Sequence, residues 1–523
     1  MATWRCFADN VADLLVDPTA SVGVRLVSLA VWVAISLVVI LPVRGRSTTG
    51  WLVATARYAI GGLTGRTRFR ARAARGRAAE LIEADLPGVL SAIEIHEGPP
   101  TGPSQTRIAI IQNRATKTWA ATASVIHPGI GLADADGRQR FGTGLSDLLD
   151  LCSRTELVDE ILLVVRTVPD DGAERGQWMT RHRRTGGPPL ARQINDDMHA
   201  ALTRAAVRTE AFVTVVVTES RLAREAKEAG GGLEGRARVL YLLMGEVESQ
   251  LRGGVGMTGV SWLTSPELAA ACSTGFAPGD RAGIIEALAA RESDNTVNAE
   301  VPWARAGPSG ADQLIRHYSH DAWNSISATI KLPVKGALMG ALAPILTPTE
   351  QGERRSFVAS FPILRQSAAD RQSASSEWAA DLGEALREKA KVKQRTKARD
   401  EAEKVRGLDR KLARGNSMTQ PYAVCTVIVP KTQRAAEFGR RLDASIRRAG
   451  FAPLRLDLSQ VIGFAASTVP LGVSLNRGTN CLQQPCRKRL PRSRACSATA
   501  PFTVNSNPIG AGRQPRHRSP SGG

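Results

Sequence analysis

The longest uncharged apolar run in the chain covers residues 26–43, with 18 residues and no charge. A helix of that length spans about 27 Å, close to the ~30 Å hydrocarbon core of a bilayer. A cleaved signal peptide carries basic residues before its core, whereas here Asp9, Asp13 and Asp17 precede the run and arginines follow it. The pattern therefore predicts a transmembrane helix over 26–43 after a short segment 1–25. A signal peptide and a buried core helix are the alternatives.

A second, shorter apolar stretch covers residues 51–63 and is interrupted by Arg57 and by the pair Gly61-Gly62. Its length is too small for a span. The pattern favours a helix that lies in the membrane interface, with Trp51 and Tyr58 near the lipid headgroups.

The remaining chain alternates between strand-like and helix-like patterns, which predicts an α/β (α+β) fold. The order β-β-α-β after residue 107 resembles part of a split βαβ unit, so we expect ferredoxin-like cytoplasmic units. Linkers at 99–103 and 306–310 divide this body into a first α/β domain over 99–305 and a second over 306–475. Strands are predicted at 107–112, 118–126, 160–167, 209–219, 257–263, 322–331, 356–361, 422–429 and 451–458. Helices are predicted at 144–157, 190–208, 233–251 and 433–448, and from Ser265 onward.

Two further segments differ from this pattern. Residues 368–414 are charged and almost free of β-branched side chains, which predicts a long helix whose far half is solvated. The tail 476–523 is basic and of low complexity, and it has no periodicity. It is typical either of a reading-frame change or of a disordered basic arm.

Charge is concentrated in two places. The net charge is +20, and the segments 44–77 (nine arginines) and 477–523 (eight arginines and one lysine) contain no acid and supply +18 of it. The near-neutral body lacks the basic field of a surface wrapped by nucleic acid. Arginines that follow an apolar span mark its cytoplasmic side, so residues 44–98 are predicted to be a basic juxtamembrane region of a plasma-membrane protein with its bulk in the cytoplasm.

The basic cluster predicted to face membrane lipid consists of Arg44, Arg46, Arg66, Arg68, Arg70, Arg72, Arg75 and Arg77. Attraction to anionic lipid is the favoured interpretation. A solvated linker and a phosphate clamp on nucleic acid are the alternatives.

The motifs of known chemistry are missing or incomplete. No P-loop and no strand-linked GxGxxG is present. His317 and His320, with Asp321 beside them, could offer metal ligands, but no further well-spaced ligand is visible. Cys481, Cys486 and Cys496 could form a metal knuckle, but they lie in the unusual tail. The pair Asp170-Asp171 is typical of a turn. Seven scattered cysteines indicate free thiols in a reducing compartment. The sequence therefore predicts no catalytic, cofactor or metal site, and a protein that is not an enzyme.

Several stretches together resemble a family of actinobacterial membrane proteins of mobile elements, of uncharacterised function. The matching pieces are LPVRGR at 41–46, TGRTRFRAR at 64–72, VPDDG at 168–172, the strand from Ala322-Trp323, the charged helix and FAASTVPLG at 464–472. The family is similar to the EccE component of type VII (ESX) secretion and to the non-ATPase N-terminal region of type IV conjugation ATPases. The chain departs from it in showing one clear span where the family shows two.

This resemblance implies a membrane-anchored structural subunit of a secretion or conjugation apparatus. Its implied partners are membrane lipid and other components of the machine, a hexameric ATPase among them, and no catalytic residue is implied. A DNA-handling accessory protein of conjugative transfer is the alternative, and an enzyme of unrecognised type is a third hypothesis.

Overall fold

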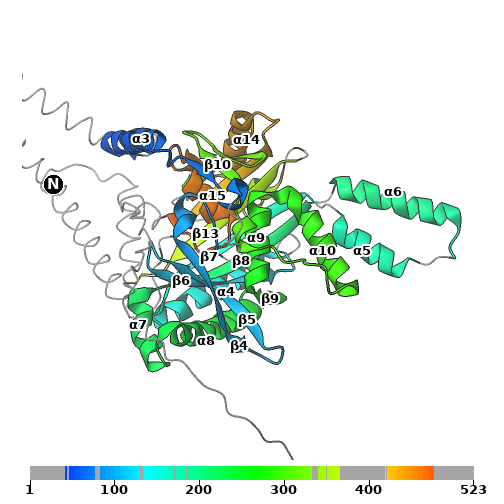
Figure 1. The fold of residues 1–523 in the computed structure, drawn as a ribbon, viewed down its shortest axis with the longest axis horizontal. Coiled ribbons are helices and arrows are strands. Elements are labelled where there is room, and N and C mark those ends of the chain that lie inside the picture. Colours follow the sequence, from blue (N-terminus) through cyan, green and yellow to red (C-terminus); the bar gives the residue numbers. More distant parts are fainter. Residues whose placement is uncertain are drawn as a thin grey trace, which may run out of the picture. The chain divides into compact units, whose positions relative to one another are not determined.

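The computed structural model describes residues 42–43, 46–76, 83–129, 133–169, 172–183, 186–205, 207–331, 340–348, 350, 352–364, 419 and 421–475. These residues form a mixed α+β fold around one large antiparallel sheet (Figure 1). The fold class predicted from the sequence is confirmed at this level.

Thirteen strands make up the sheet, and every neighbouring pair is antiparallel. Its order is β3-β10-β11-β12-β14-β13-β7-β8-β6-β5-β4, with β15 beside β12 and β9 beside β6. The strands are β3 (Arg68–Arg70), β4 (Ile93–Thr101), β5 (Thr106–Asn113), β6 (Thr118–Ile126), β7 (Val158–Pro169), β8 (Val207–Thr218), β9 (Gly259–Trp262), β10 (Gly310–Gln313), β11 (Tyr318–His320), β12 (Trp323–Lys331), β13 (Arg354–Pro362), β14 (Tyr422–Pro430) and β15 (Ala452–Arg455).

Helices cover both faces of this sheet. They are α3 (Thr48–Leu63), α4 (Ala135–Arg154), α5 (Ala173–His182), α6 (Pro189–Ala205), α7 (Glu219–Glu228), α8 (Gly232–Gly253), α9 (Ser265–Phe276), α10 (Arg281–Ser293), α11 (Ala343–Leu346), α14 (Ala435–Arg448) and α15 (Gln460–Thr468). Most follow from hydrophobic spacing. In α8, for example, Leu240, Leu243, Val247 and Leu251 recur every three or four residues and are all buried.

The sheet consists of two halves with the same strand plan. We call β4 to α9 the first half and β10 to α15 the second half. In the first, β8 lies between β6 and β7 while β9 pairs with the outer side of β6. In the second, β14 lies between β12 and β13 while β15 pairs with β12 in the same way. The halves meet where β7 pairs with β13, and Val164 faces Val358 there.

Hydrogen bonds repeat between the halves as well. Thr122 in β6 bonds to Thr214 in β8 through their hydroxyls at 2.9 Å. The residues at the same places in the second half, Ser327 and Thr426, form the same bond at 2.7 Å. Equal register and equal side-chain bonding indicate an internal duplication of one structural unit.

The two faces of the sheet carry different cores. On one face α9 and α15 share a single core, which includes Leu162, Val164 and Val358. On the other face the halves have separate cores. The first half packs α4, α7 and α8 on its strands, and the second packs α11 and α14. Because side chains alternate along a strand, neighbouring residues of β7 enter opposite cores.

A buried arginine connects the two helices of the shared face. The Arg166 guanidinium donates to the carbonyl oxygen of Ala271 in α9 at 2.8 Å and to that of Thr468 in α15 at 3.2 Å. It also donates to the Glu210 carboxylate at 2.6 Å. Burial alone would raise the pKa of Glu210, but the charges of Arg166, Arg281 and Arg208 lower it below its usual value.

The second half contains its own buried ion pair. Arg355 is almost fully buried and donates to Glu353 at 2.7 Å. Its guanidinium also donates to the carbonyl oxygen of Ile345 and to the hydroxyl of Ser445, each at 3.0 Å. This network joins β13 to α11 and α14.

Most of the predicted strands and helices are confirmed, with shifted ends; the predicted helix 144–157, for example, begins earlier as α4. The predicted linker at 99–103 is wrong, because β4 runs through Pro99 and Pro100. Proline lacks an amide donor and is tolerated there because β4 is an edge strand, with a register shift between Glu97 and Pro100.

Both predicted domains, 99–305 and 306–475, contribute strands to the one sheet, and their boundary stays a prediction. The predicted helix 368–414 and the tail 476–523 lie outside the described residues. So does the predicted span 26–43, except for Pro42 and Val43. These two residues form a short strand, β1, which pairs with β2 (Arg46–Ser47).

Candidate membrane-facing surface

The helix predicted at 51–63 is confirmed as α3, and its two sides differ in exposure. Trp51, Ala54, Tyr58 and Gly61 recur every three or four residues and are partly covered. The opposite side is apolar and open to solvent, with Leu52, Val53, Ile60 and Leu63 between 48% and 89% exposed. A helix that turns an apolar face outward has a surface suited to a partner or a membrane.

Tyr58 has a structural role that the sequence did not indicate. Its hydroxyl donates to the carbonyl oxygen of Gln313 at 3.3 Å. Gln313 also donates its backbone amide to the carbonyl oxygen of Thr67 at 2.8 Å. These bonds fasten α3 and the residues after it to β10, at the edge of the second half.

The basic cluster behind α3 divides into distinct parts. Arg66, Arg68 and Arg75 are exposed. Arg70 forms an ion pair with Asp312 at 3.2 Å, and Arg72 forms ion pairs with Glu83 and Asp85, both at 3.5 Å. Arg46 lies in β2, and Arg44 and Arg77 lie outside the described residues.

The centre of this cluster is the edge strand β3, which pairs with β10. Phe69 packs against the shared core, so Arg68 and Arg70 lie on the other face of the strand. The sheet therefore fixes the direction in which these two arginines point. The sequence did not predict this strand, because three residues with two arginines carry no strand pattern.

A second surface that the sequence missed lies on α6. Leu190, Ile194, Met198 and Leu202 recur every four residues and are each 44% to 67% exposed. Figure 1 shows α5 and α6 running side by side as a hairpin between β7 and β8. We call this hairpin the arm and the four residues its ridge. The period-four spacing could have been read from the sequence, but it looks the same as that of a buried helix.

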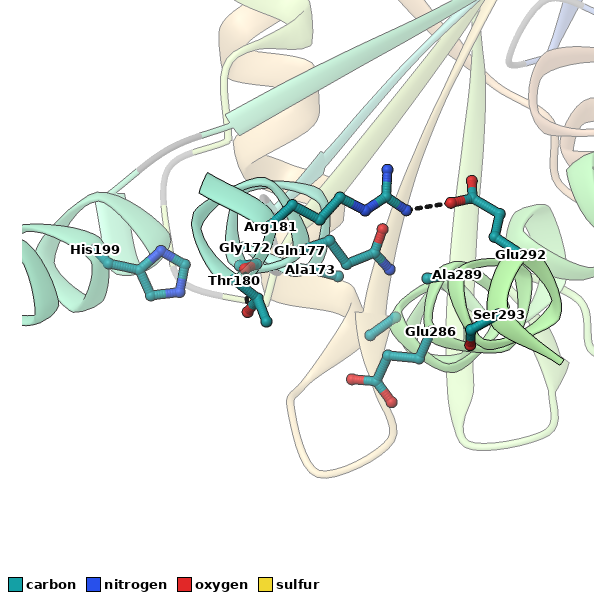
Figure 2. Close-up of a pocket in the computed structure, with 12 residues that line it drawn as sticks. Gly172, Ala173, Gln177, Thr180, Arg181, His199, Glu286, Ala289, Glu292 and Ser293 are labelled. Atoms are coloured by element: carbon teal, nitrogen blue, oxygen red, sulfur yellow. Dashed lines mark hydrogen bonds and ion pairs between the residues drawn. The ribbon is translucent and has the colours of Figure 1, made fainter. Parts of the chain in front are cut away.

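An open cleft of about 700 Å³ lies between α5 and α10, with His199 of α6 at its rim (Figure 2). Figure 2 shows Arg181 of α5 and Glu292 of α10 joined across it by an ion pair. Gln177 donates to the carbonyl oxygen of Ile285 at 2.9 Å and holds the two helices together. The cleft contains no pairing of nucleophile and base, so its contacts are those of helix packing.

One of the two histidines considered as metal ligands, His320, lies inside the core. The His320 ring is fully buried, bonds to the Ser325 hydroxyl at 2.6 Å, and packs against Phe276, Tyr318 and Phe464. Burial lowers the pKa of His320 to about 3. No group of three or more metal-ligating side chains occurs among the described residues.

The described cysteines are equally unsuited to chemistry. Cys152, Cys272 and Cys425 are buried and unbridged. Burial raises the pKa of the Cys152 and Cys425 thiols to about 12. Such thiols carry almost no thiolate at neutral pH, which is the form that reacts. Asp170 and Asp171 lie outside the described residues.

Comparison with models of known protein families found no match, and comparison with curated proteins found none either. Within the described part of the chain, no helix has the length and apolar character that crossing a bilayer requires.

Proposed function

We propose that this protein is a membrane-anchored structural subunit of a secretion or conjugation apparatus, similar to EccE of type VII secretion or to type IV components. Within the predicted span 26–43, residues 26–41 are its transmembrane helix, because Pro42 and Val43 form β1 instead. The sheet domain lies at the cytoplasmic face of the plasma membrane. The observation that carries the proposal is α3, whose apolar side is exposed and which is followed directly by the exposed Arg66 and Arg68.

The finer fold assignment belongs to this proposal. Each half contains a set of four consecutive strands, β6 to β9 in the first and β12 to β15 in the second. In space these four strands follow the order fourth, first, third, second, with helices in the connections. This is the plan of a ferredoxin-like unit built from split βαβ pieces. Residues 368–414 would be a long helix in the connection between β13 and β14, which occupies the same place in the second half as the arm does in the first.

The arm supports the docking part of the proposal. Its ridge exposes four apolar side chains on one helix. An exposed apolar helix face of this kind is typical of a protein interaction site. A hexameric ATPase of the same apparatus is the partner we expect there.

Two experiments on the full chain test this function. After high-speed centrifugation of lysed cells, the protein should stay with the membranes until detergent is added. Recovery in the supernatant without detergent would overturn the anchor.

The second experiment places a photo-crosslinking residue at position 194 on the ridge. We expect a crosslink to another component of the apparatus. A matched probe at position 242, where Leu242 is 71% exposed on α8, is the control. Crosslinks from position 194 that equal those from position 242 would contradict partner docking at the arm.

The second candidate is a DNA-handling accessory protein, which the exposed Arg66, Arg68 and Arg75 favour. In that case DNA binding should weaken steeply with salt. Replacing the three arginines by Gln should lower the slope of log affinity against log salt by about one for each phosphate that is no longer bound. The variants Arg224→Gln and Arg238→Gln, on α7 and α8, are the controls and should bind DNA as the unaltered protein does.

A further inference from the structure

The turn between β10 and β11 exposes apolar residues at the edge of the second half. Leu314 and Ile315 are 38% and 46% exposed, and Arg316 beside them is exposed too. The turn has a fixed shape. Leu314 donates its amide to the carbonyl oxygen of His317 at 3.1 Å, and Leu458 donates to that of Ile315 at 2.7 Å.

This turn lies beside α3, although 255 residues separate Tyr58 from Gln313 in the chain. The Tyr58 hydroxyl and the Thr67 carbonyl both bind Gln313, the residue immediately before Leu314. The end of α3, the start of β3 and the β10–β11 turn are therefore held as one surface. We call it the tip, and it consists of Arg66, Arg68, Leu314, Ile315 and Arg316.

The tip combines exposed apolar groups with three arginines. Two carboxylates lie beside it: Asp312, which is opposite Arg68 in the strand pairing, and the half-buried Asp457, next to Leu458. No carboxylate occurs between residues 44 and 79. The acid nearest the turn in sequence, Asp312, is held by Arg70 at 3.2 Å. Apolar side chains flanked by arginines suit the boundary between lipid headgroups and acyl chains, where cations bind anionic headgroups. An acidic protein surface is a poorer partner for the tip, because it would bind the arginines but offer no apolar contact to Leu314 and Ile315.

We propose that the tip is a second membrane contact, in which Leu314 and Ile315 insert into the boundary of an anionic bilayer and Arg66, Arg68 and Arg316 bind its headgroups. The inference rests on the proposed function, because residues 26–41 bring the domain to the membrane. It adds that the sheet domain is held against the lipid in one orientation by residues far from the anchor. The β10–β11 turn then acts as a fixed contact point and the arm is available to protein partners.

The test uses the full chain in vesicles, with Cys6, Cys481, Cys486 and Cys496 replaced by Ser. The three remaining cysteines are buried and do not compete for the label. A single cysteine, Ile315→Cys, is labelled with a polarity-sensitive fluorophore, and Leu242→Cys on α8 is the matched control. The vesicles contain either phosphatidylcholine alone or phosphatidylcholine with phosphatidylglycerol, with a quencher attached to the acyl chains.

In the anionic vesicles the label at position 315 should shift to the blue and lose about half of its emission to the quencher. The control label should change little. Adding Arg68→Gln and Arg316→Gln should return most of the emission at position 315, as should high salt, because both weaken attraction to anionic headgroups. Vesicles of phosphatidylcholine alone should give weaker quenching.

Failure of the inference and failure of the proposed function are distinguishable by flotation of the same samples. A protein that floats with the vesicles while the label at position 315 behaves like that at position 242 has an anchor but no contact at the tip, which overturns the inference. A protein that does not float overturns the anchor itself. Unfolding of each variant in denaturant verifies that the substitutions leave the fold intact.

Discussion

The two halves of the sheet share a strand plan but cover their outer faces differently. The first half uses α4 with 20 residues and α8 with 22, whereas the second uses α11 with 4 residues and α14 with 14. The first half consequently has the larger outer core. Among the residues that the structure describes, the second half buries fewer apolar side chains on this face and adds polar contacts there.

One pair of equivalent positions shows this difference clearly. Ile161 pairs with Val215 and is buried in the outer core of the first half. Arg355 pairs with Val427 at the same place in the second half, where it binds Glu353 and the end of α11. One strand plan therefore tolerates either an aliphatic or an ionic side chain at this position, the ionic one held by Glu353, Ile345 and Ser445.

The largest effect is expected from Arg355→Ile, which gives the second half the residue type of the first. The free energy of unfolding should fall by about 3–5 kcal/mol, because the Glu353 carboxylate stays buried without the guanidinium that it binds. Denaturant unfolding of the full chain in detergent measures it. Arg238→Gln, which breaks an exposed pair with Glu234, is the control and should change stability by less than about 0.5 kcal/mol. A loss below about 1 kcal/mol for Arg355→Ile would refute the role of the ion pair.

Arg166→Met should lower the free energy of unfolding by about 3 kcal/mol, because the carbonyl oxygens of Ala271 and Thr468 and the Glu210 carboxylate lose a buried donor. The pKa of Glu210 is lowered in the folded state, so its charge stabilises the fold above its unfolded pKa of ~4.3. That stability is lost as pH falls through the lower folded value. In the Arg166→Met variant, the decrease in the free energy of unfolding on acidification should be smaller than in the unaltered protein. An unchanged acid dependence would show that Arg166 does not set the protonation of Glu210.

Burial of His320 in the second half should make the stability of the protein depend on pH between 7 and 5. The counterpart of His320 in the first half is Asn113, which pairs with the first residue of β6 as His320 pairs with that of β12. Because the folded pKa of His320 is about 3, only the unfolded chain gains a proton between pH 7 and 5. Stability should therefore fall by about 2 kcal/mol over that range, given an unfolded pKa of ~6.5. His320→Asn should remove this slope, and a slope that persists would assign it to other groups.

The smallest effect is expected for the hydroxyl hydrogen bond that occurs in both halves. Thr214→Val removes one bond and should cost about 1 kcal/mol. Thr426→Val should cost somewhat more, because the Thr426 hydroxyl bonds to Ser467 as well as to Ser327. Thermal unfolding of both variants measures the difference. Losses in the reverse order would mean that the two bonds are not equivalent in the fold.

Local patterns predicted the strands that lie inside the sheet, because buried strands such as β8 and β14 are short continuous apolar runs. The same runs also contain a trace of the duplication. Residues 211–217 read AFVTVVV and residues 423–429 read AVCTVIV, and the sheet places Thr214 and Thr426 at equivalent positions. The pairing of β7 with β13 could not be predicted, because nothing local connects strands so far apart in the chain.

The candidate membrane-facing surface could be predicted only in part, because local patterns show its residues but not their tertiary neighbours. The arginines after the apolar stretches were visible, and so was the helix over 51–63. The prediction that Trp51 and Tyr58 point to lipid headgroups differs from the structure, which places both on the covered side of α3. Neither that placement nor the ion pairs of Arg70 and Arg72 could be predicted, because both depend on tertiary neighbours. The β10–β11 turn lies too far along the chain for any local pattern to relate Leu314 to Tyr58.

An open sheet of this size has two borders where a further strand could add, and unprotected borders template aggregation. In this molecule one border is β4, where Pro99 and Pro100 offer no amide to an incoming strand. The other is β3, three residues long, with an arginine on either side of Phe69. The short length and the charges of β3 discourage another strand from pairing there, just as the prolines do at β4. Molecules at high local concentration are therefore protected at both borders against pairing of their sheets into fibres.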